Sequence, residues 1–185
     1  MEEILVDSQH RTITIFGSSK PTHVDPEYGL AYETGKLFAQ HGYTVCNGGY
    51  GGVMEASARG AKEAMGKTIG VITEQFSTTA NIYIDQTICM KTLIERLMKL
   101  IELGDAYVVL KGSTGTLLEL AAVWEFCNKG LMKVRPIVLI GEFWLPTVDT
   151  LRNSLVHEGS ESAARYVDIA HSPKECVRII NERLQ

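Results

Sequence analysis

The chain has 185 residues and an ordinary apolar content of 45%, so we expect a single domain over residues 1–185 with a proper hydrophobic core. Its formal net charge of −4, without any basic stripe, argues against a nucleic-acid-binding protein. No apolar run is long enough to cross a bilayer, and the acidic start MEEILVDSQH lacks the layout of a secretion signal, so we expect a cytoplasmic protein that makes no contact with membranes.

Short apolar runs rich in β-branched residues alternate along the chain with segments of helical periodicity. The apolar runs predict strands at residues 11–16, 43–46, 67–72, 86–89, 106–110, 135–140 and 166–170. The periodic segments, with their proline and glycine boundaries, predict helices at residues 27–40, 53–65, 90–103, 117–127, 143–157 and 173–183. This alternation predicts an α/β fold, namely a Rossmann-like, doubly wound and mainly parallel sheet with helices on both faces.

Three of the predicted strands are followed by turns rich in glycine, serine and threonine. These turns are Gly17-Ser18-Ser19, the segment Asn47 to Gly52 that contains Gly48 and Gly49, and Lys111-Gly112-Ser113-Thr114-Gly115-Thr116. Glycine lets a ligand approach the backbone, and the following helix offers free N–H groups to an anion. In a doubly wound sheet such turns can converge where the strand order reverses, which predicts a phosphate site there. Each turn by itself is also compatible with a plain tight connection.

The third turn matches neither common nucleotide-binding motif. No Gly-Lys-Ser/Thr closes it, as in a Walker loop, and its glycine spacing differs from that of a dinucleotide fingerprint. The hydroxyls of Ser113, Thr114 and Thr116 favour an anion ligand, although they could equally act as ordinary helix N-caps.

Two charged side chains lie next to apolar helix faces. Glu119 falls about one turn into the apolar helix after the third turn, where it either points to water or faces the pocket of that turn. Arg96 flanks the apolar face of the 90–103 helix, where it either covers the edge of the core or pairs with a neighbouring acid. The polar connection at residues 73–85, which contains Phe76 and Tyr83, could form part of a lid or a base pocket.

The cysteines and histidines are scattered along the chain, without a Cys-x-x-Cys pair or a Cys/His cluster. We therefore expect no metal site. No lysine lies in a recognisable Schiff-base context, so pyridoxal phosphate chemistry is not expected either. Cysteines in strands and helices are usually buried small side chains. The four cysteines are Cys46, Cys89, Cys127 and Cys176.

Over about residues 13–155 the chain resembles the LOG family of Rossmann-like proteins, often labelled lysine decarboxylase-like. The resemblance is carried by Gly17-Ser18-Ser19, by Gly48-Gly49-Tyr50-Gly51-Gly52-Val53-Met54, by Glu95-Arg96-Leu97, and by Lys111-Gly112-Ser113-Thr114-Gly115-Thr116-Leu117-Leu118-Glu119. Four residues depart from the family pattern: Lys111 replaces a proline, Ser113 a glycine, Leu97 a lysine and Glu55 a glycine.

The resemblance implies a phosphoribohydrolase, which cleaves the N-glycosidic bond of a purine or cytokinin-type nucleoside 5′-monophosphate to the free base and ribose 5-phosphate. It implies that Arg96 and Glu119 are the catalytic pair, that no cofactor is needed, and that the protein is a homodimer. It also implies nucleotide and phosphate binding through Gly17, Ser18, Ser19, Gly48, Gly49, Met54, Gly112, Ser113, Thr114, Gly115 and Thr116. The alternative, favoured by Lys111 and Ser113, is a non-catalytic carrier of a nucleotide or of molybdenum cofactor from the same superfamily.

Overall fold

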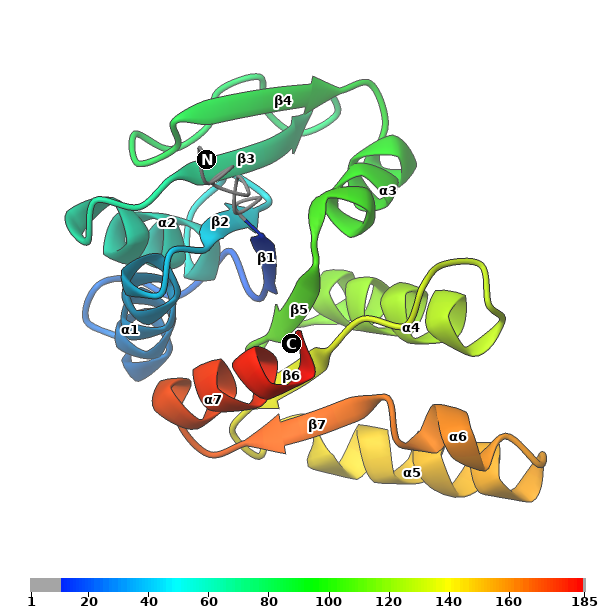
Figure 1. The fold of residues 1–185 in the computed structure, drawn as a ribbon. Coiled ribbons are helices and arrows are strands. Elements are labelled where there is room, and N and C mark those ends of the chain that lie inside the picture. The colour runs from blue at the N-terminus through cyan, green and yellow to red at the C-terminus, as the bar shows by residue number, and fades with distance from the viewer. Residues whose placement is uncertain (1–10, 185) are drawn as a thin grey trace, which may run out of the picture.

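The computed structural model describes residues 11–184. The acidic start at residues 1–10, whose sequence predicts no secretion signal, and residue 185 lie outside the described part. Seven strands form one sheet in the order β4-β3-β2-β1-β5-β6-β7, and every neighbouring pair is parallel (Figure 1). The strands are β1 (Thr12–Phe16), β2 (Thr44–Asn47), β3 (Thr68–Thr73), β4 (Gln86–Met90), β5 (Ala106–Val109), β6 (Ile137–Ile140) and β7 (Val167–Ala170). The predicted Rossmann-like α/β fold is confirmed, with a sheet that is wholly parallel.

Helices cover both faces of this sheet. Helices α1, α2 and α7 lie on one face, and α3, α4 and α5 lie on the other (Figure 1). The helices are α1 (Pro26–Gln40), α2 (Val53–Glu63), α3 (Leu93–Leu103), α4 (Thr114–Asn128), α5 (Leu145–His157), α6 (Glu161–Ala164) and α7 (Pro173–Arg183). None of the helices within residues 11–184 has the length and apolar character to cross a membrane.

The two-sided sheet explains why the strands have no polar face. Successive side chains of a strand point to opposite faces, so Ile13 and Ile15 pack with α1, α2 and α7, whereas Phe16 packs with α3, α4 and α5. In the neighbouring strand, Val108 joins the first core and Tyr107 the second. Both faces of each central strand are therefore buried, as expected for a parallel sheet.

Two helices begin three residues away from their predicted starts. Helix α3 begins at Leu93 rather than residue 90, because Thr92 and Glu95 form a capping box that fixes the helix start. Helix α4 begins at Thr114 rather than residue 117. The short helix α6 was not predicted from the sequence. The earlier start of α4 places Gly115 and Thr116 in the first helical turn.

Three of the four cysteines are buried, as the sequence predicts. Cys46, Cys127 and Cys176 are buried, whereas Cys89 is exposed on the edge strand β4. Burial raises the pKa of the Cys46 thiol to about 12 and also raises the pKa of Cys127 and of Cys176. The three buried thiols are therefore unreactive at neutral pH.

The strand order reverses between β1 and β5. These two strands are direct neighbours, with Phe16 opposite Val109 at their carboxyl ends. The turns that follow them consequently touch, and the Ser18 N–H donates a hydrogen bond to the Lys111 carbonyl at 3.1 Å. A ligand site is expected at this point of a doubly wound sheet.

Candidate functional site

A cavity of about 200 Å³ lies at the carboxyl ends of the central strands. Its polar side is formed by Gly17, Ser18 and Ser19 from the β1 turn and by Ser113, Gly115 and Thr116 from the start of α4. Arg96, Glu119 and Met54 form its inner wall, and Lys20, Tyr50 and Phe76 complete it. All three glycine-rich turns therefore border one space, the β2 turn through Tyr50.

The start of α4 presents unused hydrogen-bond donors to this cavity. Ser113 occupies the N-cap position, but its side chain makes no capping hydrogen bond. The first N–H groups of a helix have no partner within the helix, and the positive end of the helix dipole lies there. Because Ser113 does not cap them, these groups and the Ser113 hydroxyl are available to an anion. The alternative that Ser113 is an ordinary side-chain cap does not hold.

The β1 turn is held firmly on both sides. In addition to its bond with Lys111, Ser18 accepts a hydrogen bond through its carbonyl from the Val53 N–H at 2.8 Å. The Ser18 hydroxyl oxygen also accepts one from the Lys20 N–H at 3.1 Å. These contacts connect the turn to α2 and to the β5 turn, so its shape is fixed before a ligand arrives.

Arg96 lies beneath the cavity rather than at the edge of the core. The residue is 7% exposed. Its Nε donates to the Val71 carbonyl at 2.7 Å, and its Nη2 donates to the Gly48 carbonyl at 3.2 Å. The guanidinium carbon also lies 5.5 Å from the centre of the Tyr50 ring, within the range of a cation–π contact. One side of the guanidinium is thus fixed by the protein, and Nη1 remains on the side of Glu119.

Glu119 faces the cavity and Arg96, so the second of the two interpretations of this residue is correct. Its side chain is 15% exposed, and Oε1 lies 3.9 Å from Arg96 Nη1, which is longer than a hydrogen bond. Burial raises the pKa of Glu119 to about 7, and the charge of Arg96 opposes this rise. Burial likewise lowers the pKa of Arg96, against the opposing charge of Glu119. The two side chains are therefore near each other without sharing a hydrogen bond, and both can still reach a ligand.

The β2 turn contributes Tyr50 to the cavity lining, and its other residues support the site. Gly48 and Gly49 do not line the cavity. Asn47 organises this turn, because its side-chain amide donates to the Met54 carbonyl at 2.9 Å and its Oδ1 accepts from the Gly49 N–H at 2.8 Å. A Cβ atom added to Gly48 would lie 1.7 Å from Arg96 Nη2. The glycine at this position is therefore required by the close approach of the arginine.

Two more residues of the predicted binding set lie outside the cavity lining. Gly112 packs against the side chain of Thr116, and Thr114 is exposed in the first turn of α4. Lys111, the departure from the family pattern, is also outside the lining. Its Nζ forms an ion pair with Glu27 at 2.6 Å and lies 5.7 Å from the centre of the Phe143 ring.

Three cavity residues were not in the predicted set, namely Lys20, Tyr50 and Phe76. Tyr50 lies within the quoted β2 turn, and Phe76 lies in the connection that the sequence suggests as a lid or base pocket. The local signal for both was an aromatic residue in a polar loop. Their contribution to this cavity depends on contacts between segments that are distant in sequence.

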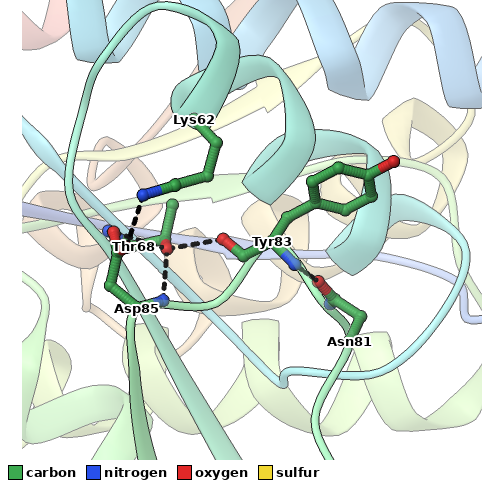
Figure 2. Close-up of polar contacts among 5 residues, drawn as sticks. All are labelled: Lys62, Thr68, Asn81, Tyr83 and Asp85. Atoms are coloured by element: carbon green, nitrogen blue, oxygen red, sulfur yellow. Dashed lines mark hydrogen bonds and ion pairs between the residues drawn. The ribbon is translucent and has the colours of Figure 1, made fainter.

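The connection between β3 and β4, residues 74–85, is anchored at its far end by the polar contacts of Figure 2. Thr68 donates to the Tyr83 carbonyl at 2.7 Å, and the Asp85 N–H donates to the Thr68 hydroxyl at 2.8 Å. The Asp85 carboxylate also pairs with Lys62. Asn81 connects this segment to the β2 turn, since its amide donates to the Tyr50 carbonyl at 2.8 Å.

Within residues 11–184, no three His, Cys, Asp or Glu side chains gather in a way that could hold a metal ion. The polar atoms of the cavity are hydroxyls, backbone N–H groups, one carboxylate and two cationic side chains. Such a set suits an anionic organic ligand.

The chain is similar to known proteins in both sequence and fold. The profile of the SLOG cluster4 family matches residues 10–177. A cytokinin riboside 5′-monophosphate phosphoribohydrolase of Mycobacterium tuberculosis is 33% identical over 132 residues, which cover 70% of this chain and 70% of that protein. A protein of the same name from Rhodococcoides fascians is 28% identical over 153 residues, covering 79% of this chain and 76% of that protein.

Solved structures of similar fold include two proteins whose names refer to the molybdenum cofactor (Moco). The molybdenum cofactor binding protein from Rippkaea orientalis is 26% identical, with a TM-score of 0.74, and the match covers 96% of this chain and 99% of that one. The Moco carrier protein from Chlamydomonas reinhardtii is 26% identical, with a TM-score of 0.72, and covers 95% of this chain and 98% of that one.

Proposed function

This chain belongs to the SLOG cluster4 family, and we propose that it is a LOG-like phosphoribohydrolase acting on a purine or cytokinin-type nucleoside 5′-monophosphate. It would cleave the N-glycosidic bond to give the free base and ribose 5-phosphate. One observation carries the proposal: the buried pair of Arg96 and Glu119, 3.9 Å apart, borders the same cavity as the uncapped start of α4. The proposed phosphate site would thus lie beside a carboxylate–guanidinium pair.

The phosphate of the substrate would bind at the start of α4. Backbone N–H groups and the helix dipole favour an anion there, and Ser113 adds a free hydroxyl. Glu119 follows Thr116 by three residues, about 4.5 Å along the helix axis. A phosphate bound in the first turn would therefore place the ribose beside the Glu119 carboxylate, and this fixed orientation lowers the entropic part of the barrier.

Glu119 would act on the anomeric carbon of the ribose. Cleavage of the bond between C1′ and the base nitrogen passes through a ribose with oxocarbenium character, which a carboxylate can stabilise or attack. Water completes the reaction, with its hydroxyl on C1′ and its proton on the departing base. This role requires the ionised form of Glu119, whose pKa of about 7 leaves a substantial ionised fraction at neutral pH.

Arg96 would hold the carboxylate in place and contribute positive charge to the site. Its Nε and Nη2 are used by the Val71 and Gly48 carbonyls, so the orientation of the guanidinium is fixed. Preorganised donors of this kind cost no reorganisation at the moment of reaction. A lysine could not replace it, because an ammonium lacks the planar set of donors that reaches two carbonyls and Glu119 together.

We also propose that the protein is a homodimer, as the resemblance implies. Its support is the exposure of three apolar side chains on the helices that carry Arg96 and Glu119, namely Ile94 and Met98 of α3 and Leu118 of α4. The opposite side of α4, with Leu120, Val123 and Trp124, is buried within the chain. Sedimentation of the purified protein would establish its oligomeric state.

The experiment that tests the function is incubation of the purified protein with AMP, other nucleoside 5′-monophosphates and the matching nucleosides. Free base is then measured by chromatography. We expect base from at least one monophosphate and none from its nucleoside, because the phosphate anchors the substrate. Release should be lost in Glu119→Gln and in Arg96→Ala. Unchanged turnover in Glu119→Gln would refute the catalytic assignment.

A second candidate is a non-catalytic carrier of a nucleotide or of molybdenum cofactor. It is supported by the match to the Rippkaea orientalis protein over 96% of this chain, and by Lys111 and Ser113, which depart from the family pattern. A carrier would bind such a ligand saturably and release no base from any monophosphate. The assay above therefore separates the two candidates.

A further inference from the structure

Phe76 is an exposed aromatic side chain that borders the cavity. It is 62% exposed, although it lies only 6.2 Å from the Tyr50 ring, measured between ring centres. Such a side chain leaves a large apolar surface in contact with water, at a cost that burial by a ligand would remove. The cavity lining combines polar groups at the start of α4 with apolar surface that includes the Phe76 and Tyr50 rings.

The segment that carries Phe76 is fixed without the help of the Phe76 ring. The Tyr50 hydroxyl accepts from the Thr73 N–H at 2.9 Å and lies 3.0 Å from the Ser77 carbonyl, to which it can donate. The Gln75 Oε1 accepts from the Leu93 N–H at 2.8 Å at the start of α3. Together with the anchor of Figure 2, these bonds hold the segment on both sides of residue 76.

Phe76 and the proposed phosphate site approach the cavity from different strands. Phe76 follows β3, whereas the phosphate site follows β5, and β2 and β1 lie between them. Both border one cavity, together with Arg96 and Glu119. The cavity therefore suits a ligand that has an anionic group at one end and a flat ring at the other.

We propose that Phe76 is the stacking platform for the base of the bound nucleotide. This inference rests on the proposed function, because it takes the ligand to be a nucleoside monophosphate whose phosphate is at the start of α4. Stacking on an aromatic side chain is tolerant of base identity, since every base has a π-face. Phe76 would thereby bind the base and help to direct C1′ towards Glu119.

The groups around Phe76 favour stacking of the base over hydrogen bonds to its edge. The Tyr50 hydroxyl is already engaged by main-chain groups of Thr73 and Ser77, so Tyr50 presents its ring rather than a free polar group. Selectivity should then follow the size of the stacked ring. We expect purine monophosphates to bind more tightly than pyrimidine monophosphates, and this preference should depend on Phe76.

The test compares the binding of AMP, CMP and ribose 5-phosphate by calorimetry, in a Glu119→Gln background that stops turnover. AMP should bind on the order of tenfold more tightly than ribose 5-phosphate, given the usual contribution of base stacking. Adding Phe76→Ala should remove this difference and the preference for AMP over CMP, without changing the affinity for ribose 5-phosphate. Phe76→Trp should retain both.

The matched control is Ile82→Ala, which removes an exposed apolar side chain from the same segment, outside the cavity. It should leave all three affinities unchanged. The proposal is overturned if Phe76→Ala weakens AMP and ribose 5-phosphate equally, if it weakens neither, or if none of the three ligands binds. If the difference between AMP and ribose 5-phosphate depends on Phe76 while the wild-type protein releases no base, the stacking platform stands and the hydrolase does not.

Discussion

The turns after β2 and after β5 are both rich in glycine, yet they differ in what surrounds their glycines. In the β2 turn, a Cβ atom on Gly48 would meet Arg96 Nη2 at 1.7 Å, and one on Gly49 would meet Ile72 at 2.7 Å. A Cβ atom on Gly115, after β5, would meet no protein atom within 4 Å. The first turn is closed by the protein itself, and the second is open at Gly115.

The polar groups of the two turns differ in the same way. Asn47 uses both ends of its side-chain amide to fold the β2 turn, and the Gly48 carbonyl is used by Arg96. At the start of α4, Ser113 makes no capping bond. Two similar sequence signals thus have different physical roles: the β2 turn positions a side chain, and the α4 start is left for a ligand.

The largest expected effect comes from filling the closed turn with Gly48→Ala. The added methyl group would displace Arg96 Nη2 and Met54 Sδ, which are the ends of flexible side chains, so we expect the fold to survive. Displacing the guanidinium by about 1 Å should reduce kcat/KM for base release at least about 100-fold. Base release and thermal unfolding of the same sample measure the two effects, and turnover within twofold of the wild type would contradict the positioning role of this turn.

The second prediction concerns how the Glu119 carboxylate, beside the turn after β5, changes the stability of the protein with pH. The native Glu119 keeps its proton up to a pH of about 7, whereas the unfolded chain releases it near 4.5. Its contribution therefore lowers wild-type stability as the pH rises from about 4.5 to 7, and stays constant above. The glutamine of Glu119→Gln cannot ionise. The free energy of unfolding of this variant, relative to that of the wild type, should therefore rise across this pH range by at most about 3 kcal/mol.

Urea unfolding of both proteins at several pH values between 5 and 8 measures this difference. The control is Glu125→Gln, which changes an exposed carboxylate on the same helix and should give curves parallel to the wild type. Parallel curves for Glu119→Gln as well would show that Glu119 is not buried with a raised pKa in solution.

The smallest effect is expected from filling the open turn with Gly115→Ala. Alanine is favoured over glycine in a helix by about 0.5–1 kcal/mol, and no protein atom obstructs the new methyl group. The variant should therefore melt about 1–4 °C higher than the wild type. Its affinity for AMP should fall several-fold, because the methyl group would enter the space of the phosphate. An unchanged affinity would remove Gly115 from the binding site.

Much of the fold can be predicted from the sequence because strands and helices alternate with clear boundaries. The start of α3 was misplaced, although the capping box of Thr92 and Glu95 was present as a local signal. The start of α4 was harder, since Thr114, Gly115 and Thr116 are poor helix formers and become helical only in the context of the packed helix that follows.

The site was only partly predictable. Arg96 and Glu119 came from the motif, but neither local pattern distinguished a buried pair from two solvent-exposed charges. Arg96 is held in place by the Val71 and Gly48 carbonyls, which lie 25 and 48 residues away in the sequence. Phe76 was recognisable as an aromatic residue in a polar segment. Its place at the cavity is set by hydrogen bonds to other segments, which no periodicity encodes.

The unequal burial of the cysteines has a practical consequence. Cys89 is the exposed cysteine, and the other three are enclosed by the core. A thiol-directed fluorophore should therefore label the folded protein at one position, on the strand that follows the segment bearing Phe76. Such a dye would provide a spectroscopic probe of the folded protein in its native sequence, without an engineered attachment point.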